Sequence, residues 1–230
     1  MKPPLIVAHR GARGRRLENT LAGFRDGISR GAEWVELDIH RTADGALVVF
    51  HDFAIGGQGL ARLTLAEAKK RAHLLRGIEL PTLEEVFDAL PRSIGVNIEI
   101  KAPGIGRELI SLLVRRRATR RVLVSSFHPP TIRAFADLRP RVVTGLLARR
   151  SPRQSVGALR RAGARALVLH HTSLDARLAA QVQRAGFSVW AWTVNRERDL
   201  RRMLALGVDA IITDFPERLL RLRDSVSLLS

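Results

Sequence analysis

Eight short apolar segments alternate with eight amphipathic segments along the 230 residues of this chain. The apolar segments predict strands at Leu5–His9, Trp34–His40, Gly95–Lys101, Val122–Ser125, Val142–Leu146, Ala166–His170, Ser188–Trp192 and Ala210–Thr213. The amphipathic segments predict helices at Thr20–Arg30, Thr82–Leu90, Arg107–Arg117, Pro130–Leu138, Pro152–Ala162, Leu174–Ala185, Arg196–Leu206 and Pro216–Leu222. A unit recurs about every 29 residues, as in a (β/α)8 TIM barrel. The predicted class is therefore α/β, with a doubly wound open sheet as the alternative, because periodicity alone does not close a barrel.

Turn residues agree with this register. Gly31, Gly163, Gly186 and Gly207 each follow a predicted helix and precede a predicted strand, where a helix C-terminal cap is expected. The segment Asp214-Phe215-Pro216-Glu217 predicts an N-cap, an early proline and a returning glutamate at the start of the last helix.

One segment interrupts the alternation. Residues 53–80 contain Gly56-Gly57-Gln58-Gly59 and a short predicted helix near Thr64–Arg71. We interpret them as a small insertion after the second strand region. No linker rich in proline or serine divides the chain, so we expect residues 1–230 to form a single domain.

Two predicted strands are not apolar on both faces, although strands of a helix-covered parallel sheet should be. In Glu36-Leu37-Asp38-Ile39-His40 and in Asn97-Ile98-Glu99-Ile100-Lys101 every second residue is polar. Side chains alternate across a strand, so each polar set shares one face. In a barrel those faces would line the lumen at the carboxyl ends of the strands, where barrel enzymes place their chemistry. A half-exposed edge strand is the structural alternative.

Three of these side chains are carboxylates. Glu36, Asp38 and Glu99 would repel one another in a confined barrel mouth unless a positive charge joins them. An oxygen-only ligand set suits a hard divalent cation, Mg²⁺ or Ca²⁺, better than zinc. Lys101 is the competing source of positive charge.

Two histidines end apolar segments beside this acidic set. His9 closes the first predicted strand, and His51 follows the apolar run at residues 46–50. A lone histidine is usually structural. Two at corresponding positions favour a role in proton transfer, because imidazole titrates near neutral pH.

The overall charge is strongly basic. The formal net charge is +17, and all but four of the 39 basic residues are arginines. Such a balance can attract nucleic acid, an anionic membrane or acidic metabolites. The arginines are scattered, and aromatic residues make up only 5% of the chain with no tyrosine. We therefore favour a solvated basic surface and expect no nucleic-acid partner.

Composition also limits the chemistry and the location. The chain has no cysteine, which excludes disulfides, thiolate metal sites and cysteine nucleophiles. No apolar run approaches the length of a membrane span, and no signal-peptide core precedes His9. We expect a cytoplasmic protein without a transmembrane segment. The sequence gives no indication of its oligomeric state.

Ten short motifs in order resemble those of the glycerophosphodiester phosphodiesterase family, from His9 to about Glu217. They are Ala8-His9-Arg10-Gly11, Glu18-Asn19-Thr20, Glu36-Leu37-Asp38, Thr42 with Asp44-Gly45, His51-Asp52, Pro81-Thr82-Leu83-Glu84-Glu85, Glu99-Ile100-Lys101, Ser125-Ser126-Phe127, Trp192-Thr193-Val194-Asn195 and Ile212-Thr213-Asp214. Each motif is weak alone, and the ordered set is specific.

The resemblance implies a TIM barrel that hydrolyses glycerophosphodiesters to glycerol 3-phosphate and an alcohol with a divalent metal, Mg²⁺ or Ca²⁺. The same resemblance implies that the metal ligands are Glu36, Asp38 and Glu99, and that the acid–base pair is His9 and His51. It also implies that the phosphate is contacted by Arg10 and Lys101, and that Trp192 forms a wall of the substrate pocket.

Two other functions stay open at this point. A lysophospholipase D would act on lipid phosphodiesters with the same scaffold. A basic anion- or nucleic-acid-binding protein would use the +17 charge and would leave the carboxylate pattern unexplained. The segment Phe53–Gly59 departs from the family pattern after His51-Asp52, so the alcohol head group is not predicted.

Overall fold

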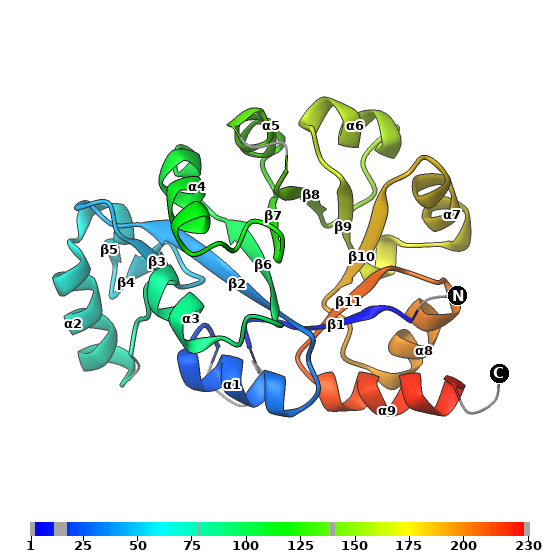
Figure 1. Ribbon diagram of the computed structural model, residues 1–230, viewed down its shortest axis with the longest axis horizontal. Coiled ribbons are helices and arrows are strands. Elements are labelled where there is room, and N and C mark those ends of the chain that lie inside the picture. Colours follow the sequence, from blue (N-terminus) through cyan, green and yellow to red (C-terminus); the bar gives the residue numbers. More distant parts are fainter. Residues whose placement is uncertain (1–2, 12–17, 78, 139–140, 228–230) are drawn as a thin grey trace.

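Eight parallel strands close into a barrel in the computed structural model (Figure 1). The structure describes residues 3–11, 18–77, 79–138 and 141–227. The barrel strands are β1 (Leu5–Ala8), β2 (Trp34–Arg41), β6 (Gly95–Ile100), β7 (Val122–Ser126), β8 (Val143–Ala148), β9 (Ala166–His170), β10 (Ser188–Trp192) and β11 (Ala210–Thr213). Strand β1 pairs with both β11 and β2, which closes the sheet. The predicted TIM barrel is thereby confirmed over the open sheet.

A helix follows each barrel strand and packs on the outside (Figure 1). The helices are α1 (Leu21–Ser29), α3 (Leu83–Ala89), α4 (Gly106–Arg115), α5 (Pro129–Leu138), α6 (Ser155–Ala162), α7 (Ala176–Arg184), α8 (Glu197–Ala205) and α9 (Pro216–Ser227). Apolar side chains of strands and helices form the main core between the two layers. Helix α6 starts three residues later than predicted, because Gln154 adopts a left-handed conformation with φ of 52°.

The segment after β2 forms a small subdomain at the left of Figure 1. Strand β3 (Leu47–Val49) pairs antiparallel with β2, and β4 (Ala54–Ile55) pairs with β5 (Gln58–Gly59). A 3₁₀ turn, η2 (Leu60–Arg62), leads into helix α2 (Leu65–Arg76), which extends beyond the predicted end at Arg71. Its own apolar cluster comprises Val48, Phe50, Ile55, Leu60, Leu63, Ala68, Ala72 and Leu80.

The lower part of the barrel lumen is filled by apolar side chains. Trp34 and Trp190 meet edge to face there, with ring centroids 5.3 Å apart. Gly95 lies beside Trp34, and a Cβ at that position would come within 2.1 Å of the indole. The polar residues Glu36, Asp38, Asn97 and Glu99 lie further along β2 and β6 than this floor. The packed floor therefore leaves the carboxyl-end mouth as the part of the lumen where a site can form.

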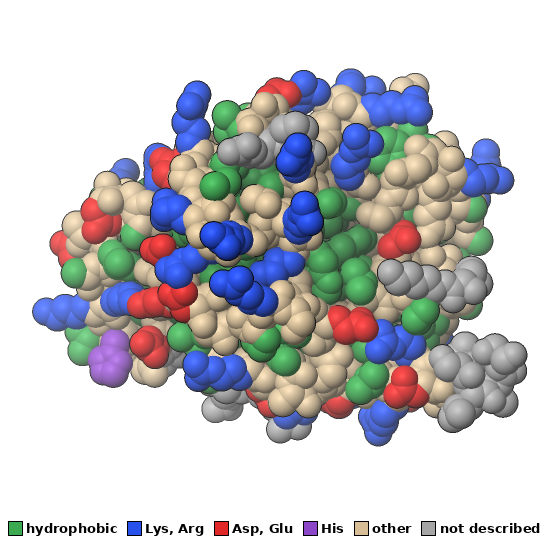
Figure 2. Space-filling view, viewed as in Figure 1, with side chains coloured by type: hydrophobic (Ala, Val, Ile, Leu, Met, Phe, Trp, Pro, Cys, Tyr) green, Lys and Arg blue, Asp and Glu red, His purple; other side chains and the backbone are tan. Residues whose placement is uncertain are grey.

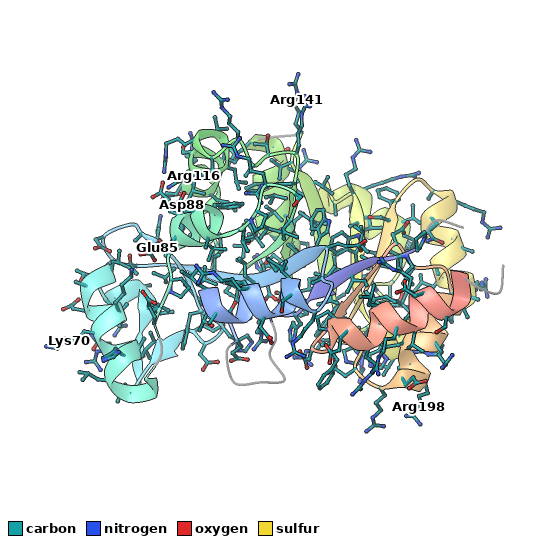
Figure 3. The ribbon with its side chains drawn as sticks, turned by 60° about the horizontal axis from the view of Figure 1, so that its bottom comes forward. Lys70, Glu85, Asp88, Arg116, Arg141 and Arg198 are labelled. Atoms are coloured by element: carbon teal, nitrogen blue, oxygen red, sulfur yellow. The ribbon has the colours of Figure 1, made fainter. Side chains whose placement is uncertain are left out.

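Charged side chains are spread over the outside of the molecule. Basic and acidic groups are interspersed on the face in Figure 2. In Figure 3 the labelled basic residues Lys70, Arg116, Arg141 and Arg198 project outward from different elements. In the described ranges, no helix combines the length and apolar character needed to cross a membrane.

Candidate active site

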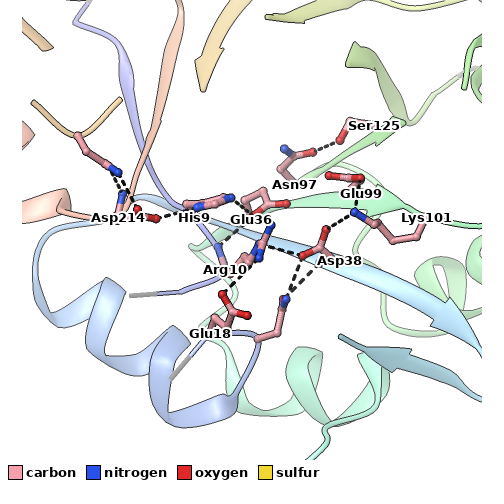
Figure 4. A network of polar contacts seen from close by, with 12 residues as sticks. His9, Arg10, Glu18, Glu36, Asp38, Asn97, Glu99, Lys101, Ser125 and Asp214 are labelled. Atoms are coloured by element: carbon pink, nitrogen blue, oxygen red, sulfur yellow. Dashed lines mark hydrogen bonds and ion pairs between the residues drawn. The ribbon is translucent and has the colours of Figure 1, made fainter. Parts of the chain in front are cut away.

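Strands β2 and β6 bring three carboxylates together at the mouth of the barrel (Figure 4). Asp38 on β2 is in register with Glu99 on β6, and Glu36 points to the same side of β2 as Asp38. One carboxylate oxygen from each of the three lies within 4.8 Å of the other two. All three residues are buried, and Asp38 has no exposed surface. The lumen placement predicted from the alternating pattern is therefore confirmed.

Burial and mutual repulsion make this cluster resist ionisation. Burial, with added repulsion from Asp38 and Glu99, raises the pKa of Glu36 well above its usual value. Burial, followed by repulsion from Asp38, raises the pKa of Glu99 to about 7. A positive charge placed among the three carboxylates would relieve both effects.

Lys101 supplies part of that charge. Its Nζ lies 3.0 Å from Oε1 of Glu99 and 3.4 Å from Oδ1 of Asp38. Burial lowers the pKa of Lys101, but the attraction of Glu99 and Asp38 outweighs burial, so the pKa is raised overall. The Arg10 guanidinium, 3.2 Å from Oδ2 of Asp38, is a second positive charge, so full ionisation of the three carboxylates would still leave one negative charge uncompensated.

The three carboxylates offer a ligand set that fits a hard divalent cation. The ligand atoms are all oxygens, which Mg²⁺ and Ca²⁺ prefer. In addition, among the described residues the buried Oδ1 of Asp38 makes no well-formed hydrogen bond, and its contact with Lys101 Nζ is a long one at 3.4 Å. A divalent cation would satisfy this oxygen more fully.

Two residues of the first βα loop hold the cluster from below. Nδ2 of Asn19 donates to Oδ2 of Asp38 at 3.0 Å, and the backbone amide of Asp38 donates to Oδ1 of Asn19 at 3.3 Å. Nε of Arg10 lies 3.2 Å from the same Oδ2, and its backbone amide donates to Glu36. Arg10 and Asn19 have φ of 52° and 57°, so the backbone takes the left-handed conformation at both residues.

His9 is fixed by a carboxylate from the opposite end of the chain. Its Nδ1 lies 2.7 Å from Oδ1 of Asp214, and Asn195 Nδ2 donates to Oδ2 of Asp214 at 2.7 Å. A carboxylate can only accept, so Nδ1 carries the proton and Nε2 faces Glu36 at 4.0 Å. Burial lowers the pKa of His9, and Asp214 partly offsets this effect. Helix α9 begins at Pro216, so Phe215 and not the predicted Asp214 directly precedes it, and the Asp214 carboxylate contacts His9 and Asn195.

His51 has a similar arrangement at the end of the antiparallel strand. Its Nδ1 lies 2.8 Å from Oδ1 of Asp52, and the ring lines the same cavity as His9. His40, by contrast, points toward the backbone oxygen of His51 and the ring of Phe53. His40 therefore supports the His51 segment and does not line the cavity.

The far wall of the cavity is aromatic. Trp192 lies at the end of β10, and its Nε1 donates to the backbone oxygen of Val168 at 3.2 Å. The rings of Phe127 and His170 meet Trp192 edge to face, at 5.5 and 5.1 Å. The cavity has a volume of about 90 Å³. Ser125 also lines the cavity, but its hydroxyl donates to Asn97 and not to a histidine.

The structure brings all eight predicted site residues to this mouth. Seven line the cavity, and Asp38 lies directly behind it: the seven are His9, Arg10, Glu36, His51, Glu99, Lys101 and Trp192. The sequence alone predicts no site role for Asp214, Asn195 or Arg149. The available signal is a polar residue within three positions of the end of an apolar strand.

Comparison with known proteins agrees with this geometry. Residues 9–218 match the model of the glycerophosphoryl diester phosphodiesterase family. A glycerophosphodiester phosphodiesterase of Caldanaerobacter subterraneus subsp. tengcongensis is 34% identical over 235 residues, covering 95% of this chain and 97% of that protein.

Solved structures show the same likeness. A glycerophosphodiester phosphodiesterase from Parabacteroides distasonis superposes with a TM-score of 0.88 at 26% identity, covering 99% of this chain and all of that one. An Oleispira antarctica phosphodiesterase, solved in complex with the product sn-glycerol-3-phosphate, gives a TM-score of 0.84 at 26% identity, covering 96% and 97%. This chain is therefore an enzyme that belongs to the glycerophosphoryl diester phosphodiesterase family.

Proposed function

We propose that this protein is a metal-dependent hydrolase that cleaves glycerophosphodiesters to glycerol 3-phosphate and an alcohol. The observation that carries the proposal is the convergence of three buried carboxylates and two carboxylate-paired histidines on one cavity. The sn-glycerol-3-phosphate bound to the Oleispira antarctica relative supports the product. Residues 1–230 would act as a single catalytic domain, with 53–80 as an insertion beside the site.

Glu36, Asp38 and Glu99 would hold the cation, Mg²⁺ or Ca²⁺, because their oxygens already meet and resist ionising without it. When bound, the cation would neutralise charge on the phosphodiester and orient it. Asn19 fixes the orientation of Asp38 by two hydrogen bonds. The chain thus prepares the ligand geometry before metal arrives.

Arg10 and Lys101 would neutralise the phosphate oxygens. Both line the cavity, and both already lie within ion-pair distance of Asp38. The planar guanidinium can donate two parallel hydrogen bonds to a phosphate, whereas the ammonium acts as a point charge.

His9 and His51 would exchange the protons. In each ring Nδ1 is paired with an aspartate, Asp214 or Asp52, so Nε2 is the atom left for the substrate. One histidine would take the proton of the nucleophile, and the other would protonate the departing alkoxide. The aspartates fix the tautomer and the direction of each ring, as orienting carboxylates do in other acid–base sites.

Release of glycerol 3-phosphate from a panel of glycerophosphodiesters tests this function. His9→Ala and His51→Ala should each reduce turnover by about a hundredfold or more. His73→Ala is the matched control, because His73 is exposed on α2 and lies outside the cavity lining. Wild-type turnover in either of the first two variants would remove that histidine from the mechanism.

A lysophospholipase D activity is the second candidate. It is favoured by the exposed ring of Phe127, which contacts Trp192 on the cavity wall and offers an apolar surface to a lipid chain. Comparing turnover of glycerophosphocholine with that of a lysophospholipid separates the two. Faster cleavage of the lysophospholipid would favour the lipid substrate.

A further inference from the structure

The wall of the cavity opposite the acidic cluster carries an arginine of its own. Arg149 follows β8, and Trp192 ends β10, whereas the acidic cluster stands on β2 and β6. In the closed barrel β10 lies across the lumen from β6. Arg149 and Trp192 both line the cavity, so they face any group that extends away from the carboxylates.

The guanidinium of Arg149 already occupies the cation-binding position on Trp192. Its Cζ lies 5.6 Å from the ring centroid, within the range of a cation–π contact. Phe127 and His170 contact the same indole edge to face. A quaternary ammonium would need an open aromatic face, and here the chain's own cation lies over that face.

The charge of Arg149 is not compensated locally. No carboxylate in the described part of the chain pairs with its guanidinium, and its side chain is exposed. The acidic residues that line the cavity, Glu36 and Glu99, belong to the cation site. This wall is therefore a positive surface. Its influence extends to His170, whose pKa is lowered by burial and by Arg149.

We infer that Arg149 is a specificity-determining residue that disfavours cationic head groups. Resting on the proposed function, this assigns the substrate class as glycerophosphodiesters with an uncharged polyol head group, in preference to choline esters. An uncharged head group is not repelled by the guanidinium of Arg149, and its hydroxyls can accept hydrogen bonds from that guanidinium. A choline head group would meet a like charge a few ångströms away.

The test compares kcat/KM for glycerophosphoglycerol and glycerophosphocholine at one fixed ionic strength. The wild-type enzyme should prefer glycerophosphoglycerol. Arg149→Met keeps much of the aliphatic stem and removes the charge. It should raise kcat/KM for glycerophosphocholine by about fivefold, the effect of one screened charge at such a distance. The value for glycerophosphoglycerol should fall by about two- to tenfold, because methionine cannot donate the hydrogen bonds that the guanidinium offers to the polyol hydroxyls.

Two further variants sharpen the result. Arg149→Lys retains the charge and should keep the wild-type ratio. Arg150→Met removes the neighbouring charge, which is exposed and outside the cavity lining, and should leave both values unchanged. Thermal unfolding of each variant confirms that it folds.

Three results would overturn the inference. An equal loss of kcat/KM for both substrates in Arg149→Met would make Arg149 a phosphate contact. An unchanged ratio would deny it a part in selection. An equal shift in Arg150→Met would trace the effect to overall surface charge. Failure of the proposed function is a separate outcome: the wild-type enzyme would release glycerol 3-phosphate from neither substrate, and the inference would fall with it.

Discussion

Nδ1 of His9 lies 2.7 Å from Oδ1 of Asp214, a residue 205 positions away in the chain. The contact joins β1 to the end of β11, the two strands whose pairing helps to close the barrel. Barrel closure and the orientation of a proposed catalytic histidine therefore depend on the same part of the fold.

Loss of the Asp214 carboxylate should impair turnover without unfolding the protein. Asp214→Asn keeps the size of the side chain but can present an amide to Nδ1, which would favour the wrong tautomer of His9. We expect kcat to fall by about ten- to a hundredfold or more, the usual cost of losing such a partner. Steady-state kinetics measures this loss, and circular dichroism checks the fold. Unchanged kcat would show that His9 needs no orienting carboxylate.

Asn19 should act on metal affinity through Asp38. Asn19→Gly removes the amide that donates to Asp38 Oδ2 and tolerates the positive φ at this position. The dissociation constant for Mg²⁺ or Ca²⁺ should rise by about ten- to a hundredfold. Isothermal titration calorimetry of the stripped protein measures this constant, and wild-type affinity would contradict the assignment.

Metal-free protein should lose stability as pH rises through the range in which Glu99 titrates. The pKa of Glu99 is about 7 in the folded state, against an ordinary value of 4.5. Between these values the folded state binds more protons than the unfolded state, so the free energy of unfolding decreases with rising pH. The loss is on the order of 3 kcal/mol for Glu99. The raised pKa of Glu36 acts in the same direction, and the lowered pKa of His9 opposes it in part.

Added divalent metal should reverse this trend, because protons and metal compete for the same oxygens. The increase in Tm on adding Mg²⁺ or Ca²⁺ should be larger at pH 8 than at pH 5.5. Glu99→Gln should show a weaker pH dependence and a smaller metal effect. Equal metal stabilisation at both pH values would argue against ligation by these carboxylates.

Gly95 should tolerate no side chain, because a Cβ would lie 2.1 Å from the Trp34 indole in the barrel floor. Gly95→Ala should lower the free energy of unfolding by about 2–3 kcal/mol or more. Gly59→Ala is the control, since its added Cβ would meet only the Phe53 carbonyl oxygen, at 3.9 Å. Urea unfolding compares the two. An unperturbed Gly95→Ala variant would mean that the tryptophan pair can shift.

Much of this fold could be predicted, because strand and helix periods are local properties of the chain. The position of the carboxylates of β2 and β6 could also be predicted, because strict alternation places them on one face of the strand and barrel closure places that face inside. Segment ends were less predictable: helix α6 begins late because Gln154 takes a left-handed conformation, which no neighbouring residue type requires.

Partners that meet across the barrel were beyond sequence reasoning. Asp214 has the residue type of an N-cap, and only closure of β11 onto β1 brings it to His9. Arg149 is one of many arginines in the sequence, and only the geometry of β8 and β10 places it over Trp192. Such contacts follow from the positions of strands, which a single sequence does not specify.

The central claim is that the three carboxylates act by holding a cation. The most direct test measures glycerol 3-phosphate release by exhaustively chelated enzyme, before and after titration with Mg²⁺ or Ca²⁺. We predict no turnover by the stripped enzyme and recovery that saturates with one bound cation per chain. Recovery should be absent from Glu36→Gln under the same conditions. Full turnover by wild-type enzyme after complete metal removal would contradict the claim that Glu36, Asp38 and Glu99 act by holding a cation.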